Sequence, residues 1–185
     1  MKNYKKNFEI LKKNNIYSEE MEHDACGVGL IASTEGKKSR KIVEYGIEAL
    51  KAVWHRGAVD ADGKTGDGAG IHVEIPKDFF IEKVEVTGHT YDNSEICVGM
   101  IFLPRNDYAA QESCKTIVES ELTKNDFSIY GWRQVPVNPK VLGEKAFQTM
   151  PEIIQVLFKS NNPELLNKDL ERKIYETRRI IENKA

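Results

Sequence analysis

The sequence predicts an α+β fold built on a mixed or antiparallel sheet. Short apolar runs, some alternating with polar residues and some continuous, indicate strands, and longer stretches with apolar residues at helical spacing indicate helices. In chain order these stretches read strand, helix, two strands, helix, two strands and helix. Because strands and helices do not alternate strictly, we expect sheet layers with helices outside rather than a doubly wound parallel sheet.

The first half of the chain is predicted to contain two strands that flank a helix and a loop. Residues 28–32 form an apolar run and are expected to be the first strand. Ser39 is a predicted N-cap for a helix of about four turns, because apolar residues recur at helical spacing beyond it. Residues 60–70 are glycine-rich and are expected to form a loop, and residues 71–75 alternate and predict a half-buried strand.

The second half is predicted to supply most of the core. Residues 96–103 form a continuous apolar run, which predicts a strand covered on both faces, with Cys97 as a structural residue inside it. A helix capped by Asp107 or Asn106 follows, with one apolar face. The remaining predicted elements are strands at residues 127–135 and 153–158 and a charged helix at residues 169–183.

Composition excludes several classes of protein. The chain has 185 residues, enough for one domain with a core, and a formal net charge of −2, which offers no footprint for nucleic acid or an anionic membrane. No apolar run approaches the length of a membrane span, and no secretory signal is found. Three cysteines without a CxxC pair favour neither a disulfide framework nor a metal cluster, and we expect a cytoplasmic protein.

Cys26 is the candidate nucleophile. It lies in the stretch DACGVGLI at residues 24–31, where a thiol precedes a glycine and an apolar run. If the bond between Ala25 and Cys26 were cut, the residue would carry a free α-amino group beside its thiol, which places a nucleophile and a base on one residue. The alternative interpretation is a buried small apolar side chain, the usual state of a free cysteine.

Four blocks then stand in order: DACGVG at residues 24–29, HRGA at 55–58, DGKTGDGAG at 62–70 and GWRQVP at 131–136. Together they resemble the amino-terminal part of the glutamate synthase large subunit, a class II glutamine amidotransferase domain of the N-terminal-nucleophile hydrolases. The resemblance runs from about Asp24 to the end of the chain.

The resemblance implies a partial four-layer αββα sandwich over residues 26–185, preceded by a leader at residues 1–25 that is removed to expose Cys26. It implies hydrolysis of L-glutamine to glutamate and ammonia, with the ammonia passed to 2-oxoglutarate elsewhere in the whole enzyme. FMN, an iron–sulfur cluster and a small electron-donating subunit would serve the remaining domains of that polypeptide, and no cofactor is expected in this segment.

The resemblance also assigns substrate-binding residues. Arg56 would hold the α-carboxylate of glutamine, since a guanidinium grips that group at two points; the alternative is an arginine exposed after a helix. Thr65, Gly66 and Asp67 would line or support the substrate loop, although an Asp-Gly sequence is otherwise simply a turn. No metal site is expected.

One feature of the family is missing from the sequence. Its members also use an Asn-Gly-Glu segment to stabilise the tetrahedral oxyanion, and no Asn-Gly dipeptide occurs in these 185 residues. Loss of one oxyanion donor typically costs a factor of about 10² to 10³ in rate. The chain is therefore expected to be an incomplete domain with little activity by itself. The alternatives are a non-catalytic fragment or binding module that keeps part of the fold, and another N-terminal-nucleophile hydrolase.

Overall fold

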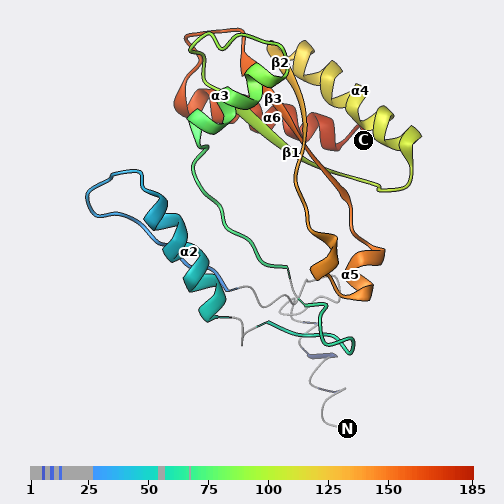
Figure 1. Ribbon diagram of the computed structural model, residues 1–185. Coiled ribbons are helices and arrows are strands. Elements are labelled where there is room, and N and C mark those ends of the chain that lie inside the picture. The colour runs from blue at the N-terminus through green and yellow to red at the C-terminus, as the bar shows by residue number, and fades with distance from the viewer. Residues whose placement is uncertain (1–5, 7–8, 11–12, 14–26, 54–56, 67) are drawn as a thin grey trace. The chain divides into compact units, whose positions relative to one another are not determined.

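The structure is a computed structural model that describes residues 6, 9–10, 13, 27–53, 57–66 and 68–185. It divides into two compact units, Met1–Gly57 and Ala58–Ala185. None of the helices in these described ranges is both long and apolar enough to cross a membrane. Figure 1 shows the helices and strands of each unit.

In the first unit, the helix α2 spans Arg40–Ala52 and confirms the predicted N-cap. The Ser39 side chain accepts a hydrogen bond from the backbone N–H of Lys41 at 3.1 Å, which satisfies one of the free donors at the start of the helix. None of the residues of α2 is buried. The apolar residues along one side of the helix, Ile42, Val43, Ile47 and Leu50, are half-buried.

The predicted strand at residues 28–32 is wrong for this structure, because residues 27–33 have no regular secondary structure. Val28 is 95% exposed and Leu30 is 88% exposed. A strand needs a neighbour for its backbone N–H and C=O groups, and no described segment pairs with this one. The apolar pattern indicates that these side chains favour burial, but it does not show which segment the strand would pair with.

The second unit is organised around a three-stranded antiparallel sheet in the order β1-β3-β2. The strands are β1 at Cys97–Leu103, β2 at Phe127–Gln134 and β3 at Glu152–Ser160. These three agree with the predicted strands, and their antiparallel pairing confirms the α+β class. The central strand β3 is the most deeply buried, since Ile154–Phe158 is buried throughout.

Helices pack on both faces of this sheet. On one face α4, at Tyr108–Lys124, and α6, at Asn167–Glu182, cover a cluster that includes Val156 and Phe158 of β3. On the other face α3, at Lys77–Val86, contributes Phe80 and Val84 to a cluster with Leu157. Alternate side chains of one strand thus enter opposite layers, as the pleat requires.

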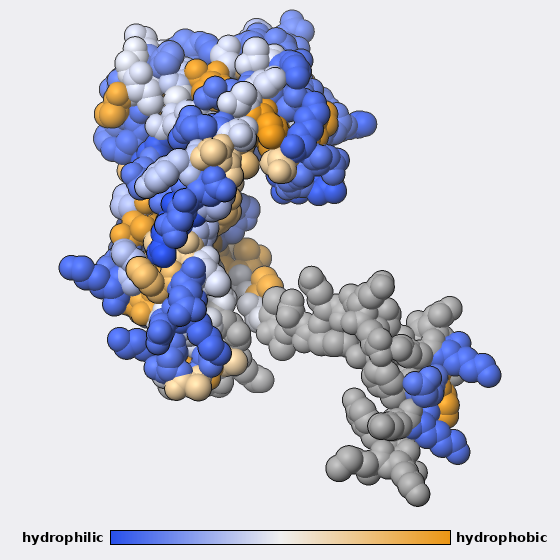
Figure 2. Space-filling model, turned by 90° about the vertical axis from the view of Figure 1, so that its right-hand side faces the viewer, coloured by the Kyte–Doolittle hydropathy of each residue, from blue (hydrophilic) through white to orange (hydrophobic). Residues whose placement is uncertain are grey.

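The first strand of the sheet is less covered than predicted. Cys97 and Leu103 at its ends are buried, but Met100 is 50% exposed and Phe102 is 63% exposed. Because β1 lies at an edge and α3 reaches only part of its face, the continuous apolar run does not become a strand covered on both faces. Figure 2 shows a largely hydrophilic surface with separate hydrophobic patches among the described residues.

The predicted strand at residues 71–75 is also wrong. The segment has no regular secondary structure, and Ile71, Val73 and Ile75 are 46%, 45% and 42% exposed. Its alternation of apolar and polar residues is real, but no described strand pairs with it. The helix α3, which follows directly at Lys77, was not predicted from the sequence, although Phe80 and Val84 have the spacing of one helical face.

Two short helical segments lie between β2 and β3 and were not predicted either. They are a 3₁₀ turn at Pro139–Val141 and α5 at Glu144–Gln148. Figure 1 shows α5 at the far end of β2 and β3 from α3 and α6. This connection contacts the loop at residues 58–66.

Candidate functional site

Three of the five predicted site residues, Cys26, Arg56 and Asp67, lie outside the described residues. Thr65 and Gly66 are described, and both belong to a loop of the second unit at residues 58–66. The structure therefore brings these two together in one loop, and it leaves the predicted positions of the other three untested.

The loop is closed by its own backbone. Val59 and Gly66 form an isolated antiparallel bridge, and the Asp60 N–H donates to the Thr65 carbonyl oxygen at 2.7 Å. Within this closure the Gly63 N–H donates to the Asp60 carbonyl oxygen at 2.9 Å. Gly63 has φ of 68°, in the left-handed region that favours glycine, so this turn needs a glycine at that position.

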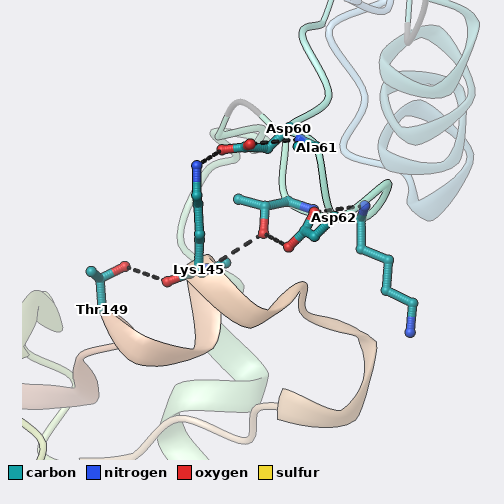
Figure 3. A network of polar contacts seen from close by, with 8 residues as sticks. Asp60, Ala61, Asp62, Lys145 and Thr149 are labelled. Atoms are coloured by element: carbon teal, nitrogen blue, oxygen red, sulfur yellow. Dashed lines mark hydrogen bonds and ion pairs between the residues drawn. The ribbon is translucent and has the colours of Figure 1, made fainter.

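The Asp62 carboxylate organises the interior of the loop (Figure 3). It accepts hydrogen bonds from the Thr65 hydroxyl at 2.5 Å, the Thr65 N–H at 2.7 Å and the Lys64 N–H at 2.9 Å. The Thr65 hydroxyl and then these two N–H groups hold the pKa of Asp62 well below its usual range. Asp62 is thus a fixed anion, and the Thr65 proton points to it.

This arrangement restricts what Thr65 can do. Its hydroxyl donates to Asp62, so its oxygen is the atom left to accept, and the Ala146 N–H lies 3.5 Å from it. Gly66 has no room for a side chain without movement, because a Cβ there would lie 3.1 Å from the Ala58 carbonyl oxygen. The loop therefore has a defined shape, set by Asp62 and by close backbone contacts.

Residues of the β2–β3 connection, far away in the sequence, hold this loop from outside. The Lys145 ammonium lies 2.6 Å from the Asp60 carboxylate (Figure 3). Gly143 is buried, and a Cβ there would collide with Thr65 and with the Asp62 carboxylate. Sequence reasoning missed Asp60, Asp62, Gly143 and Lys145. The only available signal was the Asp-x-x-Thr spacing of a side-chain-capped turn.

The GWRQVP block builds the sheet. Gly131 follows an irregularity in the pairing of β2 with β3 and has φ of 148°. The Trp132 ring N–H donates to the Glu119 carboxylate at 2.7 Å, and Arg133 donates to the Gln155 side-chain oxygen at 2.6 Å. These contacts tie β2 to α4 and β3, so this block supports the fold of the second unit.

A groove with a volume of about 510 Å³ lies beside the amino-terminal half of α4. Arg105, Gln111, Trp132 and Glu152 are among its lining residues, and none of residues 58–66 lines it. The groove and the candidate loop are therefore separate features of the second unit.

No metal or cluster site is present among the described residues, where no group of three or more His, Cys, Asp or Glu side chains could hold a metal ion. Iron–sulfur clusters are held mainly by cysteine thiolates, and the two described cysteines, Cys97 and Cys114, are not part of such a group. The described residues therefore do not supply the ligands of an iron–sulfur cluster.

Comparison with known proteins gives the family. Residues 26–185 match the family model described as glutamine amidotransferases class-II. The chain is 53% identical over 179 residues to the glutamate synthase [NADPH] large chain of Azospirillum brasilense, an alignment that covers 97% of this chain and 12% of that protein. It is 39% identical over 178 residues to ferredoxin-dependent glutamate synthase 2 of Arabidopsis thaliana, with 95% and 11% covered.

A third relative, the ferredoxin-dependent glutamate synthase of Pyropia yezoensis, is 39% identical over 175 residues, which are 94% of this chain and 11% of that protein. The chain thus spans about a tenth of the length of the relatives it matches. From the family match over residues 26–185 and these alignments we conclude that the chain belongs to the class II glutamine amidotransferases.

Proposed function

We propose that this chain is the front part of the glutaminase of a glutamate synthase, which hydrolyses L-glutamine to L-glutamate and ammonia. One observation carries the proposal: the family match begins at Cys26, the residue whose free amine and thiol the chemistry needs. The glutamate synthase names of the relatives support the same reaction.

Cys26 would be the nucleophile after removal of residues 1–25. A thiol with an ordinary pKa of about 8.5 is only partly ionised at neutral pH, and the α-amino group, with a pKa of about 8, can accept its proton directly or through one water. The thiolate attacks the carboxamide carbon of glutamine, ammonia leaves, and water hydrolyses the thioester to glutamate. While Cys26 stays in a peptide bond, its nitrogen cannot act as this base.

Arg56 and the loop at residues 58–66 would bind the substrate. The Arg56 guanidinium would grip the α-carboxylate of glutamine at two points. Thr65, Gly66 and Asp67 would border the bound glutamine. The closed backbone of this loop and the ionised Asp62 inside it support a preformed contact surface.

The rest of the proposal concerns the larger polypeptide. A second sheet would complete the four-layer sandwich, and the exposed Met100 and Phe102 of β1 supply apolar surface for further packing. The ammonia would pass to 2-oxoglutarate in the remaining domains, which would carry FMN and an iron–sulfur cluster and could bind a small electron-donating subunit. We place the protein in the cytoplasm.

Replacing the nucleophile tests the reaction. In the polypeptide that contains this chain, with residues 1–25 removed, Cys26→Ser should abolish most ammonia release from L-glutamine while the circular dichroism spectrum is unchanged. Cys114→Ser is the matched control and should keep the parental rate. A processed Cys26→Ser protein that releases ammonia at the parental rate would show that Cys26 is not the nucleophile.

The grip on the α-carboxylate needs a separate test. Arg56→Lys should raise the KM for glutamine, because an ammonium cannot copy the two-point contact of a guanidinium. Arg40→Lys, at the first residue of α2, is the matched control because Arg40 is exposed and pairs with Glu44 on the surface. An unchanged KM in Arg56→Lys would remove this residue from the site.

A second candidate function is a non-catalytic module, because no Asn-Gly dipeptide is present to supply the oxyanion segment of the family. In that case the matured chain, residues 26–185, would bind glutamine without releasing ammonia. Calorimetric titration with L-glutamine, run beside the ammonia assay, separates the two functions.

A further inference from the structure

We propose that Lys145 is a positioning residue that holds the loop at residues 58–66 in the shape that receives glutamine. The proposal rests on the proposed glutaminase function, and it adds a residue from a segment that lies about 80 positions beyond the loop. It predicts that Lys145 affects substrate affinity without touching the substrate.

The first argument is that α5 contacts both ends of the loop. The Lys145 ammonium pairs with the Asp60 carboxylate at 2.6 Å, at the beginning of the loop. The next backbone N–H, that of Ala146, lies 3.5 Å from the Thr65 hydroxyl oxygen, near the end of the loop. A single turn of α5 therefore contacts the loop at Thr65, a predicted substrate-binding residue, and at Asp60, five residues before it.

The second argument is that the two ends are mechanically coupled. The Asp60 N–H donates to the Thr65 carbonyl oxygen at 2.7 Å, so a displacement of Asp60 is transmitted to Thr65. The buried Gly143, directly before α5, leaves no space between this segment and the loop. The loop can move only if it separates from α5 or carries α5 with it.

The third argument is that, among the described residues, the Lys145–Asp60 contact is the one ion pair between the loop and α5. Asp60 makes its only ion pair among the described residues with Lys145, and the remaining contacts of its carboxylate are local, to the Ala61 N–H at 2.6 Å. Three hydrogen bonds of the Asp62 carboxylate lie within the loop and give it shape, and the Glu144 backbone N–H at the start of α5 adds a weaker one. The Lys145 pair therefore supplies the charged tether.

The expected effect is modest because the pair is accessible to water. The Lys145 side chain is 66% exposed and that of Asp60 is 33% exposed. Pairs of this kind shift an equilibrium by at most about fivefold, and salt weakens them. A dependence on ionic strength is thus the signature that distinguishes this tether from simple packing.

The experiment compares three variants of the matured enzyme by steady-state glutaminase kinetics at about 0.01 M and about 1 M salt, where the Debye length falls from about 30 Å to about 3 Å. In Lys145→Met, KM for glutamine should rise about two- to fivefold at low salt with kcat within about twofold of the parent, and the ratio to the parent should approach one at high salt. Lys145→Arg should restore the parental KM.

Lys140→Met is the matched control. Lys140 lies in the same β2–β3 connection, is exposed, and makes no ion pair in the part of the chain described here. Its KM should equal the parental value at both salt concentrations. Taking the ratio of variant to parent removes any salt effect that Arg56 exerts on glutamine itself, since both proteins share it.

A second readout does not depend on turnover. The amide resonances of Gly63 and Thr65 should shift in Lys145→Met and stay in place in Lys140→Met. A parental KM in Lys145→Met, or a raised KM that salt leaves unchanged, overturns the positioning role. If the parent releases no ammonia, the proposed function fails, and unshifted loop amides in Lys145→Met would then overturn the tether on their own.

Discussion

The Glu121 carboxylate of α4 forms an ion pair with Lys184, just beyond the end of α6, at a distance of 2.8 Å. It forms a second ion pair with Lys124 of its own helix, also at 2.8 Å. Its side chain is only 6% exposed, whereas both lysines reach into solvent. The pair therefore joins the two helices that cover one face of the sheet. Hydrogen bonds from Lys124 and Lys184 hold the pKa of Glu121 below its ordinary value of about 4.5.

Glu121→Gln should lower the unfolding temperature at pH 7 by a few degrees and by less at pH 3. A carboxyl group with a lowered pKa in the folded state stabilises the fold above its ordinary pKa, and this stabilisation is lost as the pH falls through the folded-state value. Thermal unfolding at both pH values measures the difference. Glu176→Gln, which removes an exposed pair with Arg172, is the control and should have little effect at either pH.

Leu157→Ala should be the most damaging change of a leucine in the sheet. Leu157 has no exposed surface and lies on β3 in the cluster with α3. Truncation of a buried leucine costs about 2–5 kcal/mol through lost burial and the cavity left behind. Urea unfolding should show this loss, and Leu166→Ala, at a position 51% exposed, should stay within about 0.5 kcal/mol of the parent. Equal midpoints for the two variants would contradict the assigned core.

The sequence predicted the elements whose partners are close by in the fold. β1, β2, β3, α4 and α6 were found at nearly the correct bounds, because each carries enough apolar residues to bury itself in the second unit. Helix N-caps could also be predicted. The Asp107 side chain accepts a hydrogen bond from the Ala110 N–H at 2.9 Å, as its position before an amphipathic stretch indicated. Local chemistry is enough for such elements.

The two wrong strands failed for a common reason. Residues 28–32 and 71–75 have the composition of strands. A strand also needs a second segment to pair with, and no described segment pairs with either of these two. The contacts of the loop at residues 58–66 were missed because they join segments that are far apart in the sequence. Lys145 and Asp60 are individually ordinary charged residues, and only the fold places them 2.6 Å apart.

Cys97 should resist alkylation in the folded protein. Its side chain is buried in the cluster with α4 and α6, and burial, together with the charges of Glu95 and Glu171, raises the pKa of its thiol to about 12. The reactive thiolate is therefore nearly absent at pH 8. Iodoacetamide labelling followed by mass spectrometry should modify Cys97 only after urea is added, whereas labelling of Cys97 in native protein at the unfolded rate would contradict its burial.

Gly143→Ala should displace the loop at residues 58–66 and destabilise the second unit. The backbone at Gly143 has φ of −71°, which alanine adopts freely, so the effect comes from space alone. A Cβ there would collide with the Thr65 hydroxyl and with the Asp62 carboxylate, and forcing an extra methyl group into a packed site costs about 1–3 kcal/mol.

The matched control for this substitution is Gly46→Ala, in the middle of α2, where a Cβ would meet nothing within 4 Å. Alanine should not lower stability there, because it favours a helix over glycine by about 0.5–1 kcal/mol. Thermal unfolding and the amide resonance of Thr65 measure both variants. The packing is wrongly described if Gly143→Ala leaves the Thr65 amide and the unfolding temperature at their parental values. A shifted Thr65 amide with unchanged stability would mean that the loop yields easily and that α5 holds it mainly through Lys145.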